Sequence, residues 1–189
     1  MKHLVFLLEE LSAAEMLKGV LPKILPEGIV VKFIVFEGKQ DLEKQLERKL
    51  KGWQQPNSAF LVMRDKDGGD CSVIKRQLIE KVKASGKQEV TLVRIACCEL
   101  ESFYLGDLNA VEQGLGIANL AKKQQEKKYR TSDVLSNAAQ ELQKLTQRKY
   151  QKVSGSRAIG PHLKTDGSNR SHSFNVLLNG IEKLVSITL

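Results

Sequence analysis

Histidine and cysteine are scarce in this 189-residue chain, and no long apolar run is present. The three histidines, His3, His162 and His172, are scattered, which argues against a histidine-rich metal site. The three cysteines are odd in number and lack zinc-type spacing, so we predict a reducing, cytoplasmic environment without a disulfide framework. No apolar run reaches the roughly 18 residues that a membrane span needs. Glu9 and Glu10 close the N-terminal apolar run, which is therefore expected to be a strand and not a secretory signal.

Glycine-rich nucleotide loops are also missing. The chain has no Walker loop, and no Gly-x-Gly-x-x-Gly pattern follows the first apolar run, which argues against nucleotide binding by those routes. An EF-hand would need glycine in place of Asp70 and glutamate in place of Arg76. These absences leave open the other ways in which an acidic loop can bind a cation.

The positive charge is confined to one segment. Residues 1–121 hold 17 basic and 17 acidic side chains, whereas residues 122–170 hold 12 basic and 4 acidic ones, and the whole chain carries +8. A basic block beside an acidic site suits a phosphate-backbone ligand, so we expect DNA or RNA as a partner. The alternative for any single lysine is a solvated surface position.

The first hundred residues alternate between apolar runs and amphipathic patterns. The runs predict four strands, over residues 3–8, 29–36, 59–63 and 90–98. Helical spacing of apolar residues fills the intervals, and Ser12 and Glu15 form an expected capping box at the first helix. This order predicts an α/β fold with a mainly parallel sheet of about four strands flanked by helices.

The remainder of the chain has a different pattern. We expect residues 1–108 to form the α/β core and residues 109–189 to form a mostly helical, basic extension packed on it. Ser132 is expected to cap one helix, and Ser171 or Ser173 to cap the last. Residues 150–170 are expected to be an irregular basic stretch.

Acidic residues follow three of the four expected strands. They are Glu9 and Glu10 after the first, Asp65 and Asp67 after the third, and Glu99 and Glu101 after the fourth. Because parallel strands end on one edge of a sheet, these carboxylates are expected to converge where α/β proteins bind ligands. Clustered like charges repel, and a divalent cation removes that cost; oxygen ligands favour Mg²⁺, Mn²⁺ or Ca²⁺ over zinc. The alternative is a polar turn whose aspartates cap the next helix, and Asp70 is expected to be such a cap in either case.

The order of the motifs distinguishes among acidic α/β sites. A haloacid-dehalogenase-type enzyme would carry Asp-x-Asp after the first strand, not the third. A receiver domain would have an acidic pair after the first strand and a lone aspartate after the third, and it remains a weaker alternative in which Asp65 would accept a phosphoryl group. The pattern found here, a glutamate after strand one and Asp65-Lys66-Asp67 after strand three, resembles the TOPRIM domain.

Over nearly its full length, the chain resembles a family of small stand-alone TOPRIM-like bacterial proteins related to OLD-type nucleases. The shared stretches are Glu9-Glu10-Leu11-Ser12, Asp65-Lys66-Asp67 with Asp70-Cys71, Arg94-Ile95-Ala96 with Glu99-Leu100-Glu101, and Arg170-Ser171-His172-Ser173-Phe174. Glu10 replaces the glycine that often follows the TOPRIM glutamate, which leaves open whether Glu9 or Glu10 faces a metal.

The resemblance implies phosphodiester cleavage with Mg²⁺ or Mn²⁺. Glu9, Asp65 and Asp67 would hold one metal, Glu99 or Glu101 would help with a second, and an ATPase encoded nearby, in phage defence, is the implied protein partner. A cation must also meet the charge on the phosphate. The candidates are Lys152, Arg157, Lys164 and Arg170, with His172 as a general base or phosphate contact. A metal-dependent nuclease is the main hypothesis, a non-catalytic metal- or nucleic-acid-binding subunit is the alternative, and oligomerisation is left open.

Overall fold

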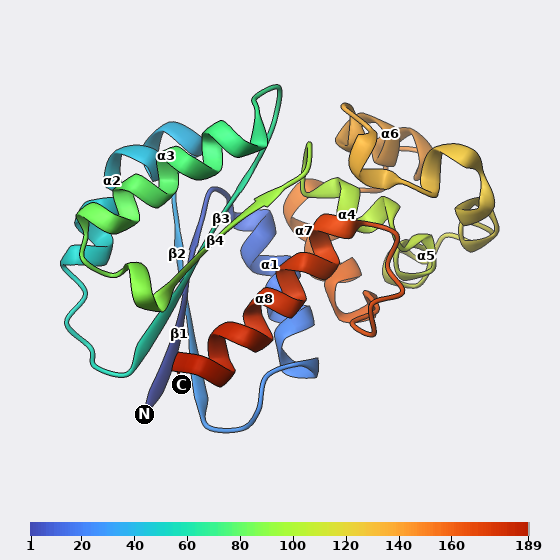
Figure 1. The fold of residues 1–189 in the computed structure, drawn as a ribbon. Coiled ribbons are helices and arrows are strands. Elements are labelled where there is room, and N and C mark those ends of the chain that lie inside the picture. The colour runs from blue at the N-terminus through green and yellow to red at the C-terminus, as the bar shows by residue number, and fades with distance from the viewer. Residues whose placement is uncertain (189) are drawn as a thin grey trace.

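The computed structural model describes residues 1–188 and is built on a four-stranded parallel sheet (Figure 1). The strands are β1 (Lys2–Leu8), β2 (Ile29–Val35), β3 (Ser58–Asp65) and β4 (Thr91–Ala96), in the order β2-β1-β3-β4. The two inner strands, β1 and β3, are apolar over residues 4–8 and 59–63, where helices cover both faces of the sheet. The predicted α/β fold class is therefore confirmed.

Two pairs of helices cover the sheet. One face packs against α2 (Lys39–Lys51) and α3 (Cys71–Ala84), whose apolar stripes join Val5, Leu7 and Val62 in one core. The other face packs against α1 (Leu11–Val20) and α8 (His172–Thr188). Figure 1 shows α2 and α3 on one side of the strands and α1 and α8 on the other.

Shorter helices lie beyond the ends of the strands. They are α4 (Glu101–Leu105), α5 (Leu108–Leu115), α6 (Ala138–Leu145) and α7 (Lys152–Ile159). Single 3₁₀ turns connect the elements: η1 (Leu21–Lys23), η2 (Gln88–Val90), η3 (Ala121–Gln125), η4 (Lys127–Tyr129), η5 (Ser132–Val134) and η6 (Gly160–His162). Phe174 and Ile181 of α8 enter the same core as Phe6 of β1, so the C-terminal helices share the core of the sheet. Within residues 1–188 no helix is both long enough and apolar enough to cross a membrane.

The expectation of an irregular stretch over residues 150–170 was wrong for its first part, because residues 152–159 form α7. This helix lies along α1 and runs in the same direction. A Cβ on Gly19 would lie 2.4 Å from the Pro161 nitrogen, and a Cβ on Gly160 would lie 2.6 Å from the Met16 carbonyl oxygen. Tertiary contact with α1 therefore stabilises a helix whose own sequence has no clear apolar period.

The predicted capping box at the first helix was also wrong. The helix begins at Leu11 with Glu10 at the N-cap position, and the Ser12 hydroxyl donates to the Glu10 carboxylate. The Glu15 carboxylate bonds Lys18 and Arg157 and does not reach back to the helix start. By contrast, the predicted cap of α3 is confirmed, because Asp70 accepts hydrogen bonds from two backbone N–H groups, and these bonds lower its pKa.

Candidate active site

The carboxyl ends of β1 and β3 bring Glu9 and Asp65 together. Leu8, the last residue of β1, pairs in register with Met63, and β3 continues for two further residues to Asp65. The Asp65 backbone N–H donates to Glu9 Oε2 at 3.0 Å. Burial raises the pKa of the Glu9 carboxyl, while the Asp65 N–H and the charge of Arg64 act in the opposite direction.

Among the carboxylates at the ends of the strands, Asp65 is the most buried after Glu101. Its side chain is only 9% exposed. Burial raises its pKa well above the usual range, and the carboxylates of Glu10, Glu101 and Glu9 raise it further. A negative charge on Asp65 is therefore costly in this environment, which is the condition under which a cation binds or a proton is retained.

Glu101 and Glu10 share a cation from the C-terminal half of the chain. Glu101, at the first position of α4, is 1% exposed and accepts a hydrogen bond from the Tyr150 hydroxyl at 2.9 Å. Burial raises the pKa of Glu101, partly offset by Tyr150 and Lys152. The Lys152 ammonium bonds Glu10 Oε2. Partial burial alone would lower the pKa of Lys152, but Glu10, Glu101 and Asp65 raise it above its usual value.

Asp67 points to a different set of partners. It is 38% exposed, adopts φ +51°, and bonds Lys39 Nζ at 2.8 Å. The Arg64 guanidinium lies 3.6 Å from the same Asp67 oxygen. The same guanidinium lies 3.8 Å from Glu9 Oε2, and the charge of Asp67 raises the pKa of Glu9, so Asp67 lies beside Glu9. Asp65, Glu9, Glu10 and Glu101, whose charges act on Asp65, are called the acidic cluster below.

Arg64 holds the turn after β3 in place. This buried side chain donates through Nε to the Asp65 carbonyl at 2.9 Å and forms ion pairs with Glu43 of α2 and with Asp67. Nothing in the sequence analysis singled out Arg64 or Tyr150. An arginine inside an otherwise apolar strand was the available signal for Arg64, whereas Tyr150 had no local signal.

Glu99 serves as the cap of a helix. Its Oε2 accepts the Ala139 N–H at 2.7 Å, in the first turn of α6. The prediction that Ser132 caps this helix was wrong: Ser132 starts η5, and α6 begins only at Ala138. The structure thus places Glu99 with a backbone group, apart from the acidic cluster.

Of the five predicted phosphate contacts, one joins the acidic cluster. Lys152 does so, at the start of α7. Arg157 bonds Glu15 halfway along α1, and Lys164 follows Leu163, whose carbonyl accepts a bond from Lys23 beyond the far end of α1. Since α1 has ten residues, Lys164 is separated from the cluster by about 15 Å of helix.

The two remaining candidates lie around the start of α8. Arg170 is exposed, and its backbone N–H donates to the Gly106 carbonyl. His172 is exposed and lines a hollow with Cys71 and Cys97. For these two residues the described part of the chain shows no bond to a carboxylate of the cluster.

The acidic cluster is not a finished metal site. Among residues 1–188, no three histidine, cysteine, aspartate or glutamate side chains are arranged so that they could hold an ion. The physical reason is visible in their partners, because Glu9 accepts a backbone N–H and Glu10 is bonded to Lys152. The donor set is nevertheless of the kind that Mg²⁺ and Mn²⁺ prefer, namely carboxylate oxygens alone.

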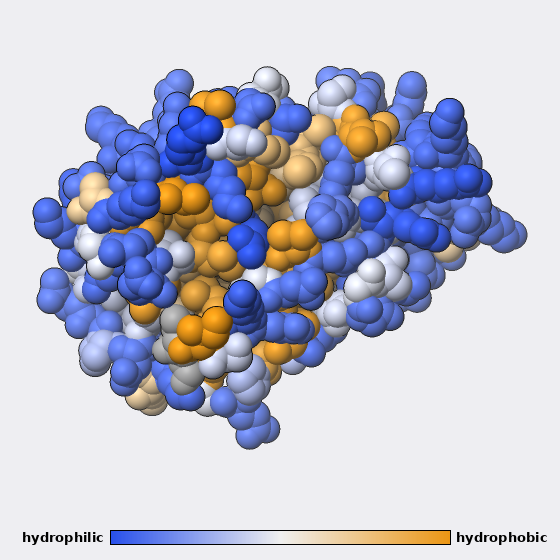
Figure 2. Space-filling view, in the orientation of Figure 1, coloured by the Kyte–Doolittle hydropathy of each residue, from blue (hydrophilic) through white to orange (hydrophobic). Residues whose placement is uncertain are grey.

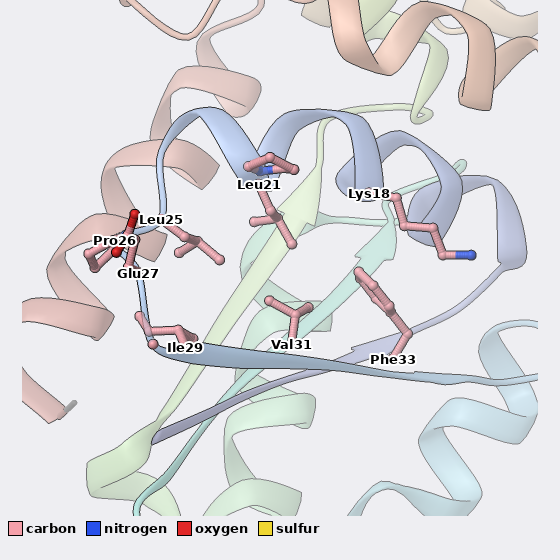
Figure 3. Close-up of a pocket in the computed structure, with 10 residues that line it drawn as sticks. Lys18, Leu21, Leu25, Pro26, Glu27, Ile29, Val31 and Phe33 are labelled. Carbon is pink, nitrogen blue, oxygen red and sulfur yellow. The ribbon is translucent and has the colours of Figure 1, made fainter. Parts of the chain in front are cut away.

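A cavity of about 360 Å³ lies elsewhere, between η1 and β2. Figure 3 shows Leu21 and Leu25 above it, facing Ile29, Val31 and Phe33 of β2 below. Its lining is mainly apolar and includes none of the carboxylates that follow the strands. The clustered carboxylates therefore lie at the sheet edge and not in this cavity.

Fold and cluster together define a parallel α/β protein with buried carboxylates at the carboxyl edge of its sheet. A family model described as "Domain of unknown function (DUF4276)" matches residues 8–182, and the chain belongs to this family. None of the curated proteins matches it. Among solved structures, the C-terminal region of the Burkholderia pseudomallei OLD protein is similar, with a TM-score of 0.54 and 15% identity. The match covers 96% of this chain and 98% of that one, and at this identity it establishes a shared fold.

Proposed function

We propose that this protein is a nuclease that hydrolyses phosphodiester bonds of DNA or RNA with Mg²⁺ or Mn²⁺. The observation that carries the proposal is the acidic cluster, in which three carboxylates from two other segments of the chain lie close to the buried Asp65. Burial and three neighbouring carboxylates raise the pKa of Asp65. Clusters of this kind, with perturbed pKa values at the edge of an α/β sheet, are typical of functional sites.

Asp65, Glu10 and Glu101 would hold the metal, with Glu9 as a further ligand. These residues supply only carboxylate oxygens and carry more negative charge than Lys152 neutralises. A bound Mg²⁺ or Mn²⁺ supplies polarisation of the phosphate and a lowered pKa for an attacking water. The Glu9 carboxylate is already fixed by the Asp65 N–H, and Tyr150 fixes Glu101, so both side chains are oriented in advance.

The Lys152 ammonium neutralises part of the negative charge of the acidic cluster. Its ammonium bonds Glu10 and lies close enough to Glu101 and Asp65 to raise its own pKa. With Glu10 engaged by a metal, the Lys152 ammonium would be available to bind a negatively charged phosphate oxygen. Of the five basic candidates, we therefore propose Lys152 as the residue that contacts the phosphate.

A basic surface lies next to the cluster and would bind the nucleic-acid backbone. Residues 121–149, the basic lobe, contain eight basic and three acidic residues. The basic side chains are exposed: Lys122, Lys123, Lys127, Lys128, Arg130, Lys144, Arg148 and Lys149. Glu99 attaches this lobe to the end of β4 by capping α6, and Figure 1 shows α6 beyond α4. The lobe supports binding to phosphates regardless of base sequence.

The motif resemblance and the similarity of fold support the same proposal. The chain resembles TOPRIM-like proteins in its glutamates after β1 and in Asp65-Lys66-Asp67, and its fold is similar to the C-terminal region of an OLD protein. OLD-type nucleases belong to the TOPRIM group. A nearby ATPase as partner in phage defence is part of the same proposal, and it rests on the resemblance alone.

The test is cleavage of labelled DNA and RNA by the purified protein with and without Mg²⁺ or Mn²⁺. We expect metal-dependent cleavage that is abolished in Asp65→Asn and strongly reduced in Lys152→Gln, with circular dichroism showing intact folding. Arg157→Gln is the matched control, because this arginine also bonds a glutamate of α1 but lies away from the cluster. Cleavage that persists in Asp65→Asn would contradict the proposal.

Non-catalytic nucleic-acid binding is the second candidate, favoured by the absence of a ready ion site among residues 1–188. In that case no metal gives cleavage, yet binding weakens steeply with salt. Replacing both Lys144 and Arg148 by glutamine is then expected to reduce the slope of log K against log salt by about 2. The same replacement at Lys44 and Lys49, on the opposite side of the molecule in α2, is expected to leave the slope unchanged.

A further inference from the structure

The outer edge of β4 is open and lies at the bottom of an apolar hollow. β4 is the last strand of the sheet and pairs with β3 alone among the described residues. Figure 2 shows apolar side chains gathered between α3 and α8, where Figure 1 places β4. Two adjoining cavities of about 180 and 200 Å³ lie along it. Their apolar lining includes Leu92, Val93, Ile95, Val176 and Leu184.

Arg94 lies at the centre of this hollow and lines both cavities. Its Nε and Nη1 donate to the carbonyls of Val176 and Val93, at 3.3 and 3.1 Å. Gly180 makes room for the guanidinium, because a Cβ there would lie 2.5 Å from Nη2. Within residues 1–188, no carboxylate forms an ion pair with Arg94. Burial lowers the pKa of Arg94, which fits a charge held without a counter-ion.

The charges that face the hollow are mainly positive. Lys75 of α3 and Lys183 of α8 flank Arg94, and Glu89 is the one acidic side chain within residues 1–188 that lines either cavity. We propose that this edge binds an extended, acidic segment of a partner polypeptide, which adds a strand to β4 and places a carboxylate on Arg94. Main-chain pairing at an open sheet edge supplies affinity, and the apolar hollow and the guanidinium supply specificity.

Two other occupants fit less well. A second copy paired through β4 about a two-fold axis would bring two Arg94 side chains together, at a cost in repulsion. A nucleic acid offers phosphates but neither a main chain that continues the sheet nor apolar side chains for the hollow. An acidic polypeptide meets the strand edge, the apolar lining and the positive charge together. This inference goes beyond the proposed nuclease activity and does not depend on it.

The test uses a fluorescein-labelled peptide in which valine alternates with glutamate and aspartate, and a matched peptide with glutamine and asparagine. By fluorescence anisotropy, we expect the acidic peptide to bind the full-length protein at least tenfold more tightly than the amide peptide. Arg94→Gln is expected to lose that preference, whereas Arg76→Gln, the same change on the exposed face of α3, keeps it. Backbone amide shifts in an NMR titration are expected to concentrate in β4.

A second variant tests the inference independently, in case Arg94→Gln does not fold. Val176→Glu puts a carboxylate into the hollow beside Arg94, so it is expected to abolish peptide binding while the melting temperature is retained. The inference is overturned if the acidic peptide fails to bind the wild type, or if it binds Arg94→Gln equally well. It is also overturned if a single-stranded oligonucleotide, and not the peptide, depends on Arg94.

Discussion

Replacing Asp65 by asparagine is expected to stabilise the protein. The side chain keeps its shape and one acceptor oxygen, and it loses a charge that is buried among Glu9, Glu10 and Glu101. Burial and these carboxylates raise the pKa of Asp65 well above its usual range, and two cations contact the cluster, Lys152 at Glu10 and Arg64 at Glu9. A residue that disfavours folding in this way is expected where function requires the charge.

The size of the effect follows from the charges. Two unit charges about 8 Å apart repel by about 2 kcal/mol at an effective dielectric constant near 20. Lys152 offsets part of this repulsion, and proton uptake by Asp65 limits the rest. We therefore expect Asp65→Asn to raise the free energy of unfolding by about 1–2 kcal/mol near pH 8, or about 2–8 °C in melting temperature.

The pH dependence has a definite sign. Because the pKa of Asp65 is raised in the folded state, the native protein binds more protons than the unfolded chain between the two pKa values, so stability falls as pH rises through that window. Below about pH 3.8, the ordinary value, the carboxyl is protonated in both states and the advantage of asparagine disappears. Thermal melts of both proteins across this pH range measure the difference.

Asp67→Asn is the matched control, because Asp67 bonds Lys39 and lies near Arg64. Loss of the Asp67 charge is expected to leave the melting temperature unchanged or to lower it. If Asp65→Asn instead destabilises the protein near pH 8, or gives the same gain at every pH, the charge on Asp65 is not the source of strain in the cluster.

Two further substitutions, one with a control, test the packing between α1 and η6 and the hydrogen bond that Glu101 accepts from Tyr150. Gly19→Ala puts a Cβ 2.4 Å from the Pro161 nitrogen, so it is expected to cost about 1–3 kcal/mol in urea unfolding. Gly68→Ala, where a Cβ meets nothing within 4 Å, is expected to stay within about 0.5 kcal/mol of the wild type. Tyr150→Phe removes a donor from the buried Glu101 and is expected to cost about 1–3 kcal/mol. An unchanged stability in Tyr150→Phe would show that this bond contributes nothing net.

The sheet could be predicted from the sequence because each strand carries its own signal. β1 and β3 are short apolar runs closed by polar residues, and burial on both faces requires that composition. Residues 152–159 carried no such signal, since α7 is stabilised by contact with α1 through Gly19 and Gly160. A contact between residues about 140 positions apart leaves no local pattern in the sequence.

The acidic cluster could be predicted in part. The common edge of parallel strands brings Glu9 to Asp65, as the alternation of strands and helices indicated. The same rule gave no information on side-chain direction, so it did not indicate that Asp67 bonds Lys39 or that Glu99 accepts the Ala139 N–H. Which carboxylate bonds a backbone N–H, and which faces the others, depends on turns with conformations such as the positive φ at Asp67.

The two acidic residues after β4 explain why the helical part of the chain is needed at the cluster. Glu99 caps α6 and Glu101 accepts the Tyr150 hydroxyl, so both fix the segment that leads from the basic lobe into α7. Lys152 follows two residues later and reaches Glu10. One of the two cations that contact the cluster is thus supplied by the C-terminal half, through bonds made by residues at the end of the sheet. A chain reduced to residues 1–108 would keep the carboxylates but lose both Tyr150 and Lys152, so Glu101 would lose its hydroxyl donor and Glu10 its ion pair.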